Sequence, residues 1–404
     1  MANNLLTISM ITNEALMVLK NNLTFTRYVT RSYDGHYGIE GAKIGATLNI
    51  RKPPRYIGRR GQAMQIEDIT EQFVPLVLNT QYGCDIQFST ADLKLSIDNF
   101  RERVIVPQIA TVANMIDSDG MFLYSQIWNS VGTPGTVPND MLTYLNAGVK
   151  LDNNACPRDG QRALVFSPQM QATEVDALKG LFQSSSKIRE QYEEGEMGTS
   201  LGFKFSMDQN TVTHTVGTFV GTPLVSGSGQ TGTTLVTKGW TAGDTLNVGD
   251  IFTCATTRSV NPQSRISTGA LMQFVVAAAF TAVGAGGNDN ITIAPGIIPA
   301  GQFQNVDVSP TDADAIVVWA GAGSSAKQPP QGLAFHKQAF AFATADLPTV
   351  GGVDMCARAV DPDLGISMRM IRAYDIKGDQ MPCRLDVLGG WVVLRPELAC
   401  RVAS

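Results

Sequence analysis

The sequence predicts a chain of mixed α+β class, with helices concentrated in the first half and strands in the second. Three observations support this: apolar residues at helical spacing within residues 89–127, no glutamate between residues 197 and 396, and a block of Gly, Thr, Ser and Ala over residues 211–325. Because glutamate is a good helix former, a region of this size without it indicates strands. The 404 residues are enough for two or three domains.

The first 24 residues read as a short helical arm. Leu16, Leu19 and Leu23 recur at helical spacing, and Thr12 or Asn13 stands in front of Glu14 as a candidate cap.

Residues 25–80 read as strand and extended loop, because Pro53 and Pro54 exclude a helix there. Between residues 27 and 60, eight basic residues face only two acidic ones, so this segment carries +6 while the whole chain carries -5. A basic loop on an acidic body suits a contact between subunits, although a solvated charged hairpin has the same composition. The candidate contact residues are Arg51, Lys52, Arg55, Arg59 and Arg60.

Residues 89–127 are predicted as the longest helix, capped by Ser89 or Thr90. Pro107 removes a backbone donor and predicts a kink or a restart of the helix at that point. One apolar face is expected on both sides of the proline. Its members are Leu93, Ile97, Phe100, Val104, Ile109, Val112 and Ile116.

Shorter elements follow. Residues 132–135 form a turn, residues 140–149 a second helix and residues 163–166 a buried strand. Ser167 caps a third helix that has Pro168 at its first position and runs to about residue 182. Residues 187–197 are predicted to form a polar loop. The carboxylates of this loop could face solvent, bind a cation, or contact the basic loop of a neighbouring subunit. These carboxylates are Glu190, Glu193, Glu194 and Glu196.

The second half is predicted to be built from short strands. Within the block of residues 211–325 the pattern predicts an inserted β-barrel or β-sandwich. Its predicted strands are 211–213, 233–236, 250–254, 272–277 and 291–293. Further strands are predicted at 334–342, 367–371, 384–388 and 391–394.

No catalytic, cofactor or metal site is predicted. Gly227, Gly229 and Gly232 match a G-x-G-x-x-G pattern, but no helix pattern follows them, so a flexible turn is the better interpretation than a dinucleotide loop. Phosphate-loop and hydrolase motifs are absent from the sequence. The histidines His36, His214 and His336 fall in three separate segments, which favours surface or packing roles over a zinc site.

The composition of the chain limits which partners, and which cellular compartment, we expect for it. A net charge of -5 and a pI near 5.3 argue against strong direct DNA binding. The six cysteines form no C-x-x-C pair and the start of the chain does not resemble a signal peptide, so we expect reduced cysteines in a cytoplasm. No apolar run is long enough for a membrane helix.

Several runs of residues resemble the major coat protein of the Salmonella short-tailed phage type. The resemblance covers most of the chain from about residue 25, and its runs occur in the family's order. They are residues 99–107, 131–136, 163–168, 188–198, 202–203, 261–264, 267–269, 273–276, 333–340, 374–377 and 382–390.

The resemblance implies the Hong Kong 97-type phage capsid fold with an inserted β-barrel-like domain. The expected layout is an N-terminal arm (1–24), an extended E-loop (25–80), a peripheral domain with a long spine helix and the first part of an axial domain (81–210), the insertion (211–325), and the remainder of both domains (326–404).

The resemblance also implies a role and partners. Subunits would form hexamers and pentamers of an icosahedral head, first around a scaffolding protein and then filled with double-stranded DNA through a portal protein. A decoration protein is a possible further partner. The compartments would be the host bacterial cytoplasm during assembly and then the virion, with no membrane, no cofactor and no enzymatic activity.

Three alternatives compete with this interpretation. An encapsulin-like compartment shell protein would share the fold and enclose enzymes. A decoration or tail tube protein would usually be shorter and lack a long helix after an extended loop. A β-rich hydrolase has no motif in its favour.

Overall fold

The computed structural model describes residues 12, 15–19, 23–31, 47–59, 61–64, 66–89, 106–178, 198–284, 288–321, 327–361 and 365–403. The chain divides into two compact units. Unit 1 comprises residues 1–50, 73–120 and 340–394, and unit 2 comprises residues 51–72, 121–339 and 395–404. Both units draw on distant parts of the sequence, and each is described by itself.

Unit 1 is organised by one long strand, β22 (Gln380–Val393). Along one edge β22 pairs antiparallel with β3 (Thr80–Ser89) over ten positions. Along the other edge it pairs first with β21 (Ser367–Arg372) and then with β19 (Phe340–Ala345), and β21 pairs in turn with β20 (Met355–Val360). A 14-residue strand is long enough to hold three partners, so β22 connects the whole sheet.

The sequence pattern predicted two strands where β22 is continuous, with a break at Gly389 and Gly390. That prediction is wrong because these glycines permit close packing instead of ending the strand. A Cβ on Gly389 would lie 2.7 Å from the ring of Phe342, and one on Gly390 would lie 2.1 Å from the carbonyl oxygen of Val77. The opposite error occurs at 334–342, predicted as one strand. The structure has β18 (Gly332–His336), a short 3-10 helix and then β19.

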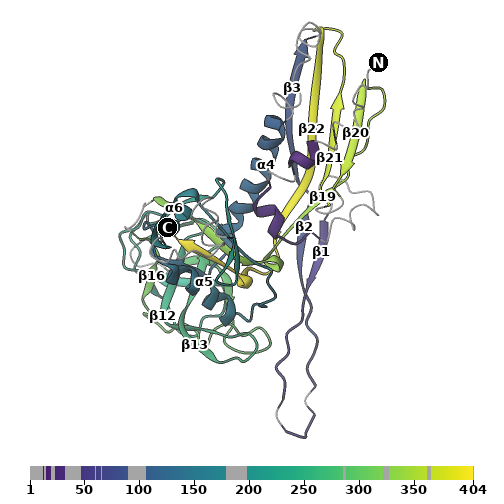
Figure 1. Cartoon of the computed structure of the whole chain (residues 1–404). Coiled ribbons are helices and arrows are strands. Elements are labelled where there is room, and N and C mark those ends of the chain that lie inside the picture. The colour runs from purple at the N-terminus through teal and green to yellow at the C-terminus, as the bar shows by residue number, and fades with distance from the viewer. Residues whose placement is uncertain are drawn as a thin grey trace. The chain divides into compact units, whose positions relative to one another are not determined.

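The helix α4 (Val106–Met121) lies beside β3 and β22 in unit 1 (Figure 1). Ile109, Val112 and Ile116 are fully buried, as the predicted apolar face requires. Pro107 lies inside the described helix, and the predicted kink or restart at this proline stays a prediction, because the residues before Val106 lie outside the described part of the chain. Residues 90–105, and with them the first half of the predicted face, lie outside the described residues. The helix ends at Met121, before the predicted residue 127, and a 3-10 helix, η3 (Phe122–Gln126), follows.

Asp117 of α4 fixes the segment that follows the N-terminal arm. Its carboxylate accepts hydrogen bonds from the backbone N–H of Thr24 at 2.6 Å, from the backbone N–H of Thr26 at 3.0 Å and from the Thr26 hydroxyl. The one-turn 3-10 helix η1 (Phe25–Tyr28) is thereby anchored to α4. Of the predicted arm helix, residues 15–19 are described and are helical, with Leu16 and Leu19 buried.

Unit 2 contains a six-stranded sheet and the two predicted shorter helices. The strand order is β4 (Ser130–Gly132), β23 (Ala399–Ala403), β18, β5 (Arg162–Phe166), β7 (Phe203–Met207) and β6 (Thr199–Ser200). Helix α5 (Met141–Asn153) begins after Asp140, whose side chain accepts a hydrogen bond from the Leu142 N–H. Helix α6 (Pro168–Leu178) begins after Ser167, whose hydroxyl caps the Met170 N–H at 3.2 Å. The predicted starts of both helices are confirmed.

The inserted segment forms a second six-stranded antiparallel sheet in unit 2. Its order is β16 (Ile316–Val318), β12 (Ile251–Val260), β13 (Ser267–Val276), β15 (Asp289–Ile297), β10 (Gly232–Lys238) and β9 (Leu224–Val225). The two outer strands meet. Val225 donates its N–H to the Asp314 carbonyl at 2.9 Å, and Ile316 donates to the Pro223 carbonyl at 3.0 Å. The sheet therefore closes into a barrel, which is one of the two forms that the pattern predicted.

The barrel encloses an aromatic core in which Trp240, Phe252, Phe274 and Phe280 pack against aliphatic residues. Four of the five strands predicted in this block overlap strands of the barrel. The fifth, 211–213, is displaced to β8 (Thr213–Thr215), which pairs with β17 (Lys327–Pro330) outside the barrel.

The G-x-G-x-x-G segment is a turn between β9 and β10, since no helix follows it. Its glycines have φ of 86°, 74° and 89°, in the left-handed region that favours glycine.

All six cysteines are free, and four of them are buried. Among the described residues, no helix has the length and apolarity needed to span a bilayer.

Candidate functional site: the extended loop and the pocket at its base

The loop of residues 53–71 runs out and back between β1 (Thr47–Lys52) and β2 (Gln72–Val77), which pair with each other (Figure 1). Glu67 on the returning limb accepts hydrogen bonds from the N–H of Ile57 at 2.7 Å and of Gly58 at 2.9 Å. These cross-limb bonds give the loop a defined shape, because they hold the two limbs together near its outer half.

The five basic residues predicted as contacts have different surroundings. Arg51 is exposed and lies 3.4 Å from Glu71, an ion pair of the kind that contributes at most about 1 kcal/mol. Arg59 is exposed and donates to the carbonyl of Gly61. Arg55 is turned inward, with its guanidinium 3.3 Å from the Glu397 carboxylate. Lys52 lines the pocket described below, and Arg60 lies outside the described residues.

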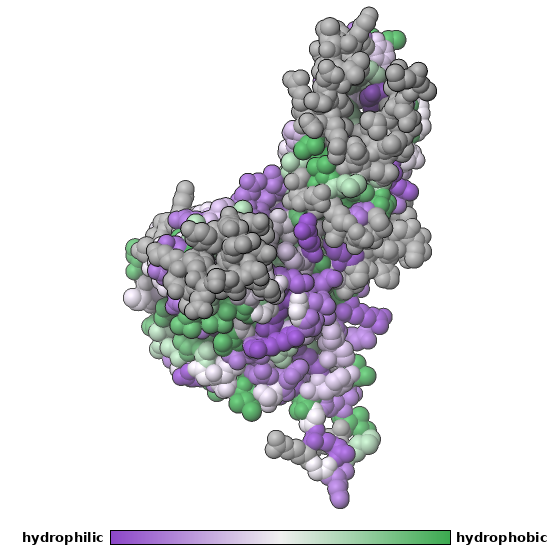
Figure 2. Space-filling model, viewed as in Figure 1, coloured by the Kyte–Doolittle hydropathy of each residue, from purple (hydrophilic) through white to green (hydrophobic). Residues whose placement is uncertain are grey.

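The loop also exposes large apolar side chains, which the charge pattern did not reveal. Figure 2 shows hydrophobic and hydrophilic surface interspersed along it. Five such residues occur within 14 positions, and exposed apolar residues gathered in this way are typical of interaction surfaces. They are Tyr56 (53% exposed), Ile57 (51%), Met64 (75%), Ile66 (82%) and Ile69 (66%).

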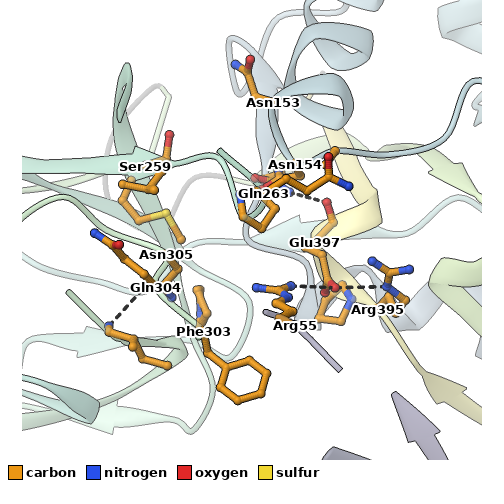
Figure 3. A pocket seen from close by; sticks show the side chains of 18 of the residues that line it. Arg55, Asn153, Asn154, Ser259, Gln263, Phe303, Gln304, Asn305, Arg395 and Glu397 are labelled. Atoms are coloured by element: carbon orange, nitrogen blue, oxygen red, sulfur yellow. Dashed lines mark hydrogen bonds and ion pairs between the residues drawn. The ribbon is translucent and has the colours of Figure 1, made fainter. Parts of the chain in front are cut away.

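At the base of the loop lies a pocket of about 750 Å³, wholly within unit 2 (Figure 3). Its wall is made by residues 52–56 of the loop, the end of α5, strands β12 and β13, residues 295–305, and residues 395–397. This volume lies in the range of small-ligand pockets.

Two contacts tie the loop to the barrel beside this pocket. The Arg265 guanidinium donates to the Tyr56 carbonyl at 3.0 Å, and the Gln302 amide donates to the Asp68 carbonyl at 2.6 Å. Arg265 lies in the turn between β12 and β13, so the inserted barrel holds both limbs of the loop of its own subunit.

The pocket wall carries four cations and one carboxylate. Glu397 lies between Arg55 at 3.3 Å and Arg395 at 3.2 Å, as Figure 3 shows. Burial lowers the pKa of Lys52, although the nearby Glu397 acts in the opposite direction. Burial likewise lowers the pKa of Lys150, whose ammonium donates to the Gln273 side-chain oxygen at 3.1 Å. The pocket is therefore an electropositive, partly buried space.

The acidic loop predicted as the partner of these cations lies outside the described residues. Glu190, Glu193, Glu194 and Glu196 all fall in the undescribed range 179–197.

A buried polar network in unit 2 was missed by the sequence analysis. The Tyr124 hydroxyl lies 2.9 Å from His214 Nδ1, and His214 Nε2 lies 2.7 Å from the Asp250 carboxylate. The Arg401 guanidinium stacks on the Tyr124 ring at 5.0 Å, and burial lowers the pKa of Arg401 to about 10. Burial also raises the pKa of Tyr124, which disfavours a reactive phenolate.

This network joins η3, β8, the barrel and the last strand, which is a structural role. The other described histidine, His336, is also buried and contacts Asp159 at 3.1 Å. His36 lies outside the described residues. Within the described part of the chain, no group of three or more metal-ligating side chains comes together.

The chain matches a phage coat protein family over nearly its whole length. It is therefore a major capsid protein of tailed phages, the class that self-assembles into the shell of the head. The family is described as P22 coat protein - gene protein 5; the match covers residues 1–401, and the chain belongs to this family. This membership confirms the predicted class, the shell-forming role and a capsid fold of mixed α+β class. It agrees with the Hong Kong 97 type that the resemblance implies.

Solved structures that the chain matches include chains described as Mycobacterium phage Che8 and as the capsid of the cyanophage P-SCSP1u. The first has 13% identity and a TM-score of 0.44, with 94% of this chain and 90% of that chain covered. The second has 11% identity and a TM-score of 0.43, with 89% and 83% covered. A virus-like particle from Pyrococcus furiosus has 8% identity and a TM-score of 0.39, with 97% of each chain covered. No curated protein matches the sequence.

Proposed function

We propose that copies of this chain form hexamers and pentamers, which close into an icosahedral shell around double-stranded DNA without sequence-specific contact. The proposed partners are a scaffolding protein, a portal protein and, where one exists, a decoration protein. Assembly would take place in the host bacterial cytoplasm, and the chain would have no catalytic step of its own. The predicted division into arm (1–24), E-loop (25–80), insertion (211–325) and flanking domains remains part of this proposal.

The observation that supports this proposal most directly is the extended loop of residues 53–71. It has a fixed hairpin shape, and it exposes apolar and basic side chains together. A neighbouring subunit would cover the apolar residues. The basic residues would then fix which surface of the neighbour is used, because charge complementarity contributes mainly to specificity and association rate.

We propose further that basic residues of the loop pair with the acidic residues 190–196 of a neighbour. Arg59 and Arg60 are the best placed by sequence, since Arg55 is already paired with Glu397 of its own subunit. Contacts of this kind weaken as ionic strength rises.

The test is electron microscopy of the purified full-length chain, produced with and without its scaffolding protein. Regular closed shells that need the scaffold are the expected result, and monomers at every concentration would contradict the proposal. We expect Arg59→Glu with Arg60→Glu, and separately Glu193→Lys with Glu194→Lys, to lower particle yield severalfold with unchanged unfolding. Lys204→Glu with Lys377→Glu is the matched control, since both lysines are exposed and lie outside the loop. Normal yield from both test variants would contradict the charged contact.

A further inference from the structure

The pocket at the base of the loop carries more positive charge than its own subunit neutralises. Four cations line it, namely Lys52, Arg55, Lys150 and Arg395, against the single carboxylate of Glu397. Both arginines contact that carboxylate, so its charge is already shared between them.

The two lysines therefore have no carboxylate of their own. Among the described residues, neither Lys52 nor Lys150 forms an ion pair, and the one polar contact of the Lys150 ammonium is the neutral side-chain oxygen of Gln273. Gln273 is itself held in place, because its amide and oxygen bond the carbonyl and the N–H of Ser130 at 3.0 and 2.9 Å.

Partial burial makes this arrangement unfavourable without an anion. A charge removed from water loses hydration, and a well-placed opposite charge restores part of that loss. Walls of low dielectric also concentrate the field of several like charges within a confined pocket. The pocket is thus suited to bind an anion that carries more than one negative charge.

The charge distribution of the chain indicates where the anion comes from. Outside residues 27–60 the chain is strongly acidic, and its densest run of carboxylates is four glutamates within residues 190–196. In a shell, each subunit lies beside other copies of the same sequence, so the acidic segment of a second copy is a ligand that the assembly itself supplies. A lysine ammonium is a compact charge that can donate to a carboxylate oxygen from several directions.

We propose that this pocket receives the carboxylates of an acidic segment of a second copy of this chain, residues 190–196, with Lys52 and Lys150 as the receiving cations. This inference rests on the proposed shell function and extends it: the acidic segment proposed to pair with the loop arginines would also enter the pocket, where the two lysines bind it. Arg55, Glu397 and Arg395 form the fixed wall against which the segment lies.

The test measures binding of a labelled peptide of residues 188–197 to the unassembled full-length chain by fluorescence anisotropy at low salt. We expect Lys52→Gln with Lys150→Gln to weaken binding at least tenfold. Lys204→Gln with Lys377→Gln removes the same charge at exposed positions and should bind as the native chain does. Lys52→Arg with Lys150→Arg keeps the charge and should retain most of the affinity, which separates loss of charge from misfolding. A peptide with glutamine at all four glutamate positions should not bind.

Three results would overturn the inference. They are no binding of the peptide to the native chain, equal binding by the Lys52→Gln, Lys150→Gln variant, and tighter binding of a short single-stranded DNA that depends on the same two lysines. The last result would assign the pocket to phosphates. Particle yield separates this inference from the proposed function. If the native chain forms shells and the glutamine variant forms them equally well, the pocket assignment fails and the shell function stands.

Discussion

In the inserted barrel, a buried carboxylate such as that of Asp244 accepts hydrogen bonds from backbone N–H groups of the same barrel. The loop of residues 53–71, by contrast, leaves large apolar side chains exposed to solvent. Asp244, which is 5% exposed, accepts hydrogen bonds from the N–H groups of Val220, Gly221 and Thr241. Ile66, by contrast, is 82% exposed. The barrel satisfies these carboxylates by itself, whereas the proposed partner of the loop is a neighbouring subunit, so we expect a substitution in the barrel to act on folding and one in the loop to act on assembly.

The largest effect on folding is expected at Asp244. Replacing it with alanine leaves three partly buried backbone N–H groups without their acceptor, and a hydrogen bond to a charged group contributes about 1.5–3 kcal/mol. We expect Asp244→Ala to lower the free energy of unfolding by about 3 kcal/mol or more, measured by urea denaturation of the unassembled chain.

The control for Asp244 is Lys238→Ala, which removes an exposed ion pair with Asp312 and should cost less than about 1 kcal/mol. Equal losses from both variants would mean that the barrel does not depend on its internal carboxylates.

A smaller effect on the free energy of unfolding is expected at Glu174 on α6, a buried carboxylate without a hydrogen-bond donor among the described residues. Neither of its side-chain oxygens has a hydrogen-bond partner in the described structure. Burial, helped by the nearby Asp140, raises the pKa of Glu174 from its ordinary value of 4.5 to about 6. The folded chain therefore binds this proton more tightly than the unfolded chain. The stabilisation is complete below pH 4.5 and is lost as the pH rises through 6, a difference of about 2 kcal/mol.

We expect Glu174→Gln to be up to about 2 kcal/mol more stable than the native chain at pH 8 and nearly equal to it at pH 4, because glutamine does not ionise. Denaturant unfolding across this pH range measures the difference. The exposed Asp176→Asn on the same helix serves as the control. A gain in stability that does not change between pH 4 and pH 8 would rule out ionisation of Glu174 as its cause.

The smallest effect on folding is expected in the loop. Ile66→Ser with Ile69→Ser changes two side chains that are 82% and 66% exposed, so the free energy of unfolding should change by no more than about 0.5 kcal/mol. Particle yield, counted by electron microscopy, should nevertheless fall severalfold, because these residues lose the apolar surface that a neighbour would cover. Full yield from this variant would show that the loop does not assemble through its apolar residues.

The elements with local signals were predictable from the sequence. Asp140 and Ser167 mark the starts of α5 and α6 because capping depends on a few consecutive residues. The insertion was recognisable as β-rich from its composition. The break in residues 334–342 and the continuity of β22 were not predictable, because both are set by packing against residues distant in sequence, such as Phe342 against Gly389.

The candidate site was predictable only in part. The basic segment was evident from its charge, but the orientation of each side chain was not. Arg55 and Glu397 are separated by 342 positions, so no local pattern indicates that this arginine is neutralised within its own subunit. The same holds for Lys150, which joins Lys52 in one pocket although they lie on different elements. The exposed apolar residues of the loop could have been found, since Ile66 and Ile69 flank Glu67 and Asp68 in a segment that has no helical or strand periodicity.

The closure of the barrel has a consequence for the state of the chain before it meets its partners. An open β-sheet ends in rows of unpaired N–H and C=O groups, which act as templates for uncontrolled strand addition. Here Val225 and Ile316 use those groups to join β9 to Asp314 and the start of β16, so the sheet closes on itself where its two outer strands meet. In a chain that assembles with copies of itself, that closure limits uncontrolled strand addition at this junction.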